Sequence, residues 1–145
     1  MTLTRTMVFA LALFATGCAT MVYTVGGVMR DDSAAQREAV STWLIARGYG
    51  LEYRNTPDGP ATTAWTITPN LLTRTRHVLT ARRRGENVEN VLDVTLETGP
   101  AVERPIVTVD ATTWRLADGL RMSQIAVSAE AREDASALIA AFSER

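Results

Sequence analysis

Two residue types that carry much of protein chemistry occur once each in this chain, as Cys18 and His77. One cysteine excludes an intramolecular disulfide framework and a cysteine-based zinc cluster, and one histidine excludes a His-rich metal site. His77 is the only candidate for an imidazole base, and we expect it to be structural, with Asp93 pointing to the opposite sheet face. No G-x-S-x-G, P-loop or H-E-x-x-H pattern occurs. The sequence therefore predicts no catalytic residue, no metal ligand, no cofactor and no enzymatic activity.

Arginines concentrate in one short segment of the chain. They are Arg74, Arg76, Arg82, Arg83 and Arg84. Because guanidinium groups bind phosphates and carboxylates, this segment could be an interaction patch for lipid phosphates, lipopolysaccharide or an acidic partner. The alternative is that acids on the following segment neutralise it as an ordinary charged strand pair. Over the whole chain the net charge is −1, which argues against nucleic acid as a partner.

The first residues have the three parts of a secretory signal. Arg5 supplies the positive start, residues 8–15 are apolar, and Thr16 and Gly17 are small. The apolar run is too short to cross the hydrocarbon layer, which takes about 20 residues. An uncharged stretch continues over residues 6–29, however, and could form an uncleaved membrane helix. That alternative would make the chain a single-pass inner-membrane protein with a periplasmic domain.

The motif Ala15-Thr16-Gly17-Cys18 resembles the lipobox of bacterial lipoproteins, which ends in a small residue and an invariant cysteine. The resemblance implies cleavage between Gly17 and Cys18, a diacylglycerol on the sulfur, and a further acyl group such as palmitate on the new amino group. Acyl chains on Cys18 would then anchor the protein to the membrane. Ala19, in place of an aspartate, implies the periplasmic face of the outer membrane. An ordinary cleaved signal with an incidental Cys18 is the simpler alternative.

These observations divide the chain into three parts. Residues 1–17 form the lipoprotein signal peptide, residues 18–32 a lipidated tether, and residues 33–145 a single α+β periplasmic domain. Residues 22–25 alternate in polarity, and they could instead form a first short strand.

Helical spacing and end signals predict two helices. The first begins at a capping box at Ser33 and stops at Gly48, a residue suited to a left-handed conformation. The second follows Ser128 as N-cap, with Glu130 in its first turn. The buried stripe of the second helix is predicted to be Ala131, Ala135, Leu138 and Phe142.

Alternating apolar residues predict about six antiparallel strands between the helices. Residues 49–54 and 61–68 flank a turn-rich segment, and Trp65 and Ile67 should share the buried side. Asp118-Gly119 is a tight-turn signal joining residues 105–116 to 120–127, with Trp114 opposite Ser123.

The sharpest pairing prediction concerns residues 74–97, with Gly85-Glu86 as a two-residue turn. This register gives one apolar face and one charged face, and a slip of one residue would destroy both. The predicted pairs are Leu79 with Leu92, His77 with Val94, Thr75 with Leu96, Arg82 with Glu89, and Arg74 with Glu97.

The order of elements predicts an α+β fold with the C-terminal helix packed on one face of an antiparallel sheet. Residues 39–97 contain Trp43, Gly48-Tyr49-Gly50-Leu51, Asp58-Gly59 and the arginine-rich hairpin. This stretch resembles the helix-grip domains of some outer-membrane lipoproteins, including the BamC-type component of the β-barrel assembly machinery. The resemblance covers under half of the chain and implies a helix-grip-like fold, without a role.

The leading functional hypothesis is a lipid-anchored cell-envelope protein that serves as a non-enzymatic interaction or accessory module for an envelope protein partner. A second hypothesis is a periplasmic carrier of a small ligand or lipid, held in a cavity between helix and sheet. An enzyme would have to depend on His77.

Overall fold

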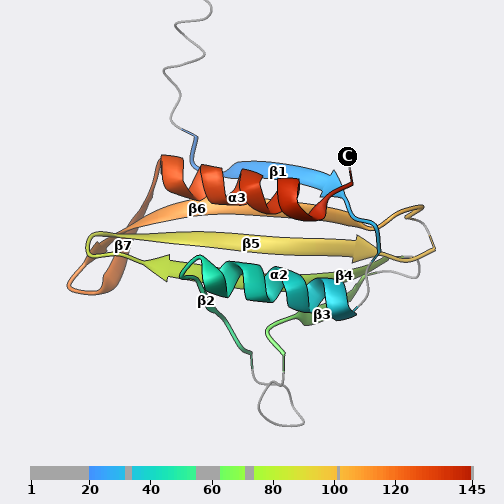
Figure 1. The fold of residues 1–145 in the computed structure, drawn as a ribbon. Helices are drawn as coiled ribbons and strands as arrows, with labels where there is room; N and C mark the ends of the chain where they lie inside the picture. The colour runs from blue at the N-terminus through green and yellow to red at the C-terminus, as the bar shows by residue number, and fades with distance from the viewer. Residues whose placement is uncertain (1–19, 32–33, 55–62, 71–73, 101, 145) are drawn as a thin grey trace, which may run out of the picture.

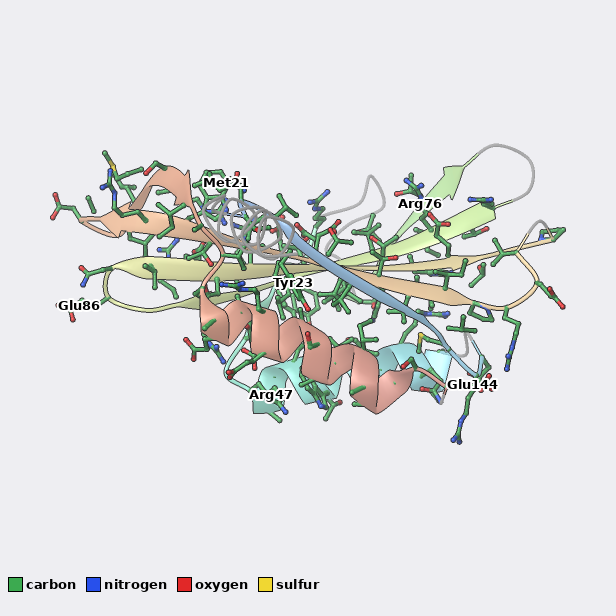
Figure 2. The ribbon with its side chains drawn as sticks, turned by 90° about the horizontal axis from the view of Figure 1, so that it is seen from above. Met21, Tyr23, Arg47, Arg76, Glu86 and Glu144 are labelled. Carbon is green, nitrogen blue, oxygen red and sulfur yellow. The ribbon has the colours of Figure 1, made fainter. Side chains whose placement is uncertain are left out.

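The computed structural model describes residues 20–31, 34–54, 63–70, 74–100 and 102–144. Within these ranges seven strands form one antiparallel sheet, and both helices lie on the same face of it (Figures 1 and 2). The elements are β1 (Tyr23–Val28), α2 (Ala34–Ala46), β2 (Gly50–Leu51), β3 (Thr66–Asn70), β4 (Arg74–Arg84), β5 (Val88–Thr98), β6 (Ile106–Ala117), β7 (Leu120–Ile125) and α3 (Ala129–Phe142). The predicted α+β class, with the C-terminal helix packed on the sheet, is confirmed.

Three long strands, β4, β5 and β6, form the middle of the sheet (Figure 1). Two short strands complete each edge: β1 and β7 pair with β6, whereas β2 and β3 pair with β4. The long strands are rich in valine and threonine, whose branched side chains suit a pleated surface. Each edge strand is at most half as long as the long strand that it pairs with.

The hydrophobic core lies between the helices and the sheet face that they cover. Leu44 of α2 and Leu138 of α3 pack against Leu79, Leu92 and Val109 of the three central strands, and all five are fully buried. Because side chains alternate along a strand, the neighbours of these residues point to the opposite face. We call that opposite face the open face. Its polar side chains include Thr24, Glu52, Arg76, Thr80, Arg82, Arg84, Glu89, Asp93, Glu97 and Asp110.

Local end signals were predicted well. Gly48 has φ +84° at the end of α2, where a side chain would be strained. Ser128 caps α3 by accepting a hydrogen bond from the Ala131 N–H, and the predicted buried stripe of this helix faces the core. Asp118 and Gly119 both have positive φ, as the turn between β6 and β7 requires. The expected cap at Ser33 lies outside the described residues.

The register predicted between β4 and β5 is wrong by two residues. Leu79 pairs with Val94, His77 with Leu96, and Arg84 with Glu89. The Gly85 N–H donates to the Val88 carbonyl oxygen, so the turn residues are Glu86 and Asn87. A shift of two keeps every side chain on its predicted face, because side chains alternate with a period of two. The faces were therefore right although the partners were wrong.

Two further predictions are corrected at the sheet edges. Ser123 pairs with Arg115 and not with Trp114, because a β-bulge between Arg115 and Leu116 shifts the β6–β7 register. Trp65 is buried as expected, but Ile67 is 62% exposed, because it lies on the wall of an open pocket beside the start of α2.

The folded part of the chain begins earlier than residue 33. Residues 23–28 form β1, each paired with a residue of β6, and Met29 forms a bridge with Ser143 and is buried. The predicted tether over residues 18–32 is corrected accordingly, in favour of the first strand that residues 22–25 suggested.

Candidate functional site

His77 lies on the covered face of β4 and is 8% exposed. Asp93 lies on the open face and accepts a hydrogen bond from the Thr80 hydroxyl at 2.7 Å. The sheet therefore separates the imidazole from this carboxylate, as the alternation of strand residues predicted. The two side chains do not form a catalytic pair.

The arginines of the β4–β5 hairpin are distributed among five carboxylates. The most buried of these is Glu89, whose side chain is 2% exposed on the open face. Arg84 contacts it through Nη2 at 2.9 Å, and Arg82 through Nη1 at 3.5 Å. Arg121 of β7 completes the group, with Nε 2.6 Å from a Glu89 oxygen. Three cations around one buried anion link β4, β5 and β7 at this end of the sheet.

Arg82 also forms an ion pair with a second carboxylate, that of Glu52. Its Nη2 lies 2.7 Å from Glu52, just after β2. The hydrogen bond and charge of Arg82 hold the pKa of the Glu52 carboxyl below its usual range, against the opposing effect of partial burial.

Arg74 and Arg76 lie at the other end of the hairpin, where both contact Glu97. The Arg76 Nε lies 2.8 Å from Glu97, and the Arg74 Nη1 lies 3.5 Å from it. Arg76 is on the side of the sheet away from the helices (Figure 2). The predicted pair Arg74–Glu97 thus exists as a diagonal contact, while Arg76 is the direct cross-strand partner.

Arg83 points to the covered face, where it reaches Asp134 of α3 at 2.8 Å. The same carboxylate accepts a hydrogen bond from the Tyr49 hydroxyl at 2.7 Å and pairs with Arg47 at 3.2 Å. Arg83 also contacts Glu130 at 2.7 Å and stacks its guanidinium over the Tyr49 ring. Burial, together with the Asp134 carboxylate, raises the pKa of the Tyr49 hydroxyl, so Tyr49 stays a hydrogen-bond donor. The five hairpin arginines therefore do not form one surface.

Thr20 and Met21 are hydrogen-bonded to β7 and to the segment that follows it. The Thr20 carbonyl oxygen accepts the Val127 N–H at 2.9 Å, and the Gln124 side-chain amide donates to the Met21 carbonyl oxygen at 2.8 Å. Met21 lies near the β7 end of the sheet, away from the helices (Figure 2). Cys18 and Gly17, the predicted lipidation and cleavage residues, lie outside the described residues. Only Ala19 separates Cys18 from Thr20.

The membrane helix considered for residues 6–29 is contradicted in its last part, because residues 23–28 form β1 and Met29 pairs with Ser143. The uncharged stretch ahead of the sheet is therefore confined to residues 6–22. Among the residues that the structure describes, no helix is both long and apolar enough to cross a membrane.

A pocket of about 270 Å³ lies between the start of α2 and β3. Trp65 and His77 contribute to its wall, and Ile67 lies at its edge. The Trp65 indole N–H is already hydrogen-bonded to the Arg37 carbonyl oxygen and the Ser41 hydroxyl, so the ring is fixed in place. The other lining residues are Ala34, Arg37, Glu38 and Thr63.

Several members of these clusters were missed by sequence reasoning. Arg121, Glu52 and Arg47 meet their partners through contacts between distant segments, and no local pattern points to them. Asp134 did carry a signal, because it lies three residues after Ala131 and four before Leu138, on the predicted buried stripe. A carboxylate at such a position requires buried cationic or hydrogen-bonding partners.

The chain matches no family model, no curated protein and no solved structure.

Proposed function

We propose that this chain is a lipid-anchored protein of the bacterial cell envelope, whose domain acts by binding and not by catalysis. The observation that carries the proposal is the position of Cys18. It ends a lipobox-like motif, and it precedes by two residues the first described residue that is hydrogen-bonded into the sheet. Cleavage between Gly17 and Cys18 would thus leave the described fold intact and place the acylated residue at its very start.

The length of the uncharged stretch supports a cleaved signal over an uncleaved helix. With β1 in the sheet, residues 6–22 remain, which is seventeen positions. A membrane-spanning helix needs about 20 apolar residues, and this stretch also contains Thr16, Gly17 and Thr20. A short apolar run with small residues before the cysteine fits a signal peptide better.

The charged side chains of the β4–β5 hairpin have structural partners, so we do not assign the proposed binding surface to them. The hairpin arginines are engaged by Glu89, Glu97 and Asp134, so their charges stabilise the sheet and its contact with α3. Because Ala19 follows the cysteine, the location that we propose is the periplasmic face of the outer membrane. The partner that we propose there is an envelope protein.

The intact mass of the membrane-extracted protein tests the proposal, with wild type measured beside Cys18→Ser. We expect a wild-type mass equal to residues 18–145 plus acyl chains, and the loss of both cleavage and acylation in the variant. Ser41→Ala serves as a control, because this residue lies in α2 and leaves the motif unchanged. An unmodified full-length wild-type mass would overturn the proposal.

A small-ligand carrier is the second candidate, and the pocket beside Trp65 and His77 favours it. Its volume of about 270 Å³ is close to the lower end of the range for small-molecule sites, about 300 Å³. Native mass spectrometry of protein extracted without added lipid tests this candidate. A bound small molecule that is lost in Ala34→Trp, which fills the pocket, would support it, and an empty wild-type protein would contradict it.

A further inference from the structure

The distance between the proposed anchor and the folded domain is very short. Thr20 is fixed by its hydrogen bond to Val127, and Cys18 lies two positions before it. Two residues span at most about 8 Å, since consecutive Cα atoms are about 3.8 Å apart. The polar layer on each side of a bilayer is about 5–8 Å thick, as the total and hydrocarbon thicknesses imply. An acylated Cys18 would therefore bring the edge around Thr20 to the headgroups.

Four large apolar side chains are exposed at this edge. Met21 and Val22 are 44% and 45% exposed, and they precede β1 directly. Leu120 and Met122 of β7 are 68% and 61% exposed. The bond from Gln124 to the Met21 backbone holds the two segments together. We call these four residues, Met21, Val22, Leu120 and Met122, the apolar strip.

The β-bulge in β7 contributes to the strip. Arg121 pairs with Leu116 and Ser123 pairs with Arg115, so Met122 is the extra residue without a cross-strand partner. Bulges commonly redirect a side chain at a sheet edge. Here the bulge leaves Met122 exposed, while Arg121 turns to the open face and binds Glu89. The Arg121 guanidinium therefore lies on the open face, while the apolar side chain of Met122 is exposed at the sheet edge.

We propose that the apolar strip is a membrane-contact surface, which lies against the phospholipid headgroups of the leaflet that holds the anchor. The inference rests on the proposed acylation of Cys18. Apolar side chains at the boundary between headgroups and acyl chains gain free energy by leaving water, and this adds to the binding by the acyl chains. The strip then sets the orientation of the domain, with β1 and β7 next to the bilayer and the β2–β3 edge away from it.

Cysteine labelling tests this inference directly. Cys18 is the only cysteine in the sequence, and acylation would block its thiol, so an introduced cysteine would be the only residue that reacts with a thiol label. Met122→Cys and Leu120→Cys each introduce one labelling site on the strip. Ile67→Cys is the matched control, because Ile67 is equally exposed but lies on β3 at the opposite edge of the sheet. Each acylated full-length protein is labelled with a fluorophore and reconstituted in vesicles of phosphatidylethanolamine and phosphatidylglycerol.

We expect a water-soluble quencher to act on the strip labels about threefold or more weakly than on the Ile67 label, as partial burial at the headgroups requires. Nitroxides carried by the lipids should quench the strip labels selectively. Protection from the soluble quencher without quenching by lipid nitroxides would mean that a second copy or another protein covers the strip, and would overturn the inference.

The intact mass of each labelled protein separates the two proposals. Acylated protein whose strip and control labels are quenched alike would overturn the membrane-contact surface and leave the proposed anchor standing. Protein without acyl chains would overturn the proposed function, and the inference that rests on it.

Discussion

Asp134 connects three parts of the chain that are far apart in sequence. Its carboxylate receives Tyr49 from the α2–β2 connection and Arg83 from β4, and it pairs with Arg47 just beyond α2. The side chain is only 9% exposed. Removing it would leave the Tyr49 hydroxyl without its acceptor and the half-buried Arg83 with only the exposed Glu130, whereas Arg47 is itself 43% exposed. Removing one partner of a buried ion pair costs more than the net value of the interaction, because the other charge stays shielded from water.

We predict that Asp134→Ala lowers the free energy of unfolding by about 3–5 kcal/mol, the usual cost of breaking a buried ion pair. Urea denaturation measures this. Glu130→Ala is the matched control, because Glu130 binds the same Arg83 from the same helix but is 67% exposed. The control should lose less than about 1 kcal/mol. Equal losses for the two variants would contradict the central role of Asp134.

The lowered pKa of Glu52 predicts how the stability of the protein changes with pH. Its pKa is lowered in the folded protein by Arg82, so its contribution to stability is present above the ordinary value of 4.5 and is lost as the pH falls below it. Glu52→Gln should therefore destabilise the protein at neutral pH and reduce the further loss on acidification. Urea midpoints at neutral pH and below pH 4.5 measure the difference. A variant that loses as much stability on acidification as the wild type would refute the assignment.

At the scale of the elements, Gly27 of β1 lies against the C-terminal end of α3 and the residue that follows it. A Cβ atom at Gly27 would lie 2.7 Å from the Ser143 Cβ and 3.2 Å from a methyl group of Ile139. The Glu144 N–H also donates to the Val28 carbonyl oxygen. The glycine thus allows the C-terminal segment to lie directly on the first strand.

We predict that Gly27→Ala destabilises the domain by about 1–3 kcal/mol, because the added methyl group overpacks this contact. Adding Ser143→Gly should restore part of the loss, since it removes the atom that the new Cβ meets. Gly50→Ala, in the edge strand β2, meets only ordinary contact at 3.7 Å and should change stability by less than about 0.5 kcal/mol. Thermal unfolding of the four proteins provides the measurement, and a stable Gly27→Ala protein would contradict the predicted contact.

For the molecule as a whole, Thr20 is the first described residue, and its carbonyl oxygen already accepts a hydrogen bond from the Val127 N–H. A chain that begins at Thr20 should keep the melting temperature of the Cys18→Ser protein. A chain that begins at Met29 should melt at least several degrees lower, because it lacks β1 and the bond between Tyr23 and Ser136. Circular dichroism during heating distinguishes the two. Equal melting of both shortened chains would show that β1 is dispensable.

The errors in the sequence-based predictions have a common physical origin. Alternation placed His77, Leu79 and Asp93 on the correct faces, because each face depends only on neighbouring residues. It could not distinguish registers that differ by two residues, since both satisfy the same pattern. The predicted pairing of β6 with β7 is correct next to the turn, but the register is shifted by one residue beyond it, because the bulge adds Met122 to β7 and no local sequence signal marks the bulge.

The sequence by itself determined the α+β class, the ends of α2 and α3 at Gly48 and Ser128, and the turn at Asp118-Gly119. These features depend on backbone preferences and periodicities within a few residues. Only the tertiary structure decided that β1 joins β6, that Asp134 gathers its partners, and that the segment after Cys18 lies beside β7. Such contacts join residues from 51 to 107 positions apart, so they depend on how the whole sheet and both helices share one core.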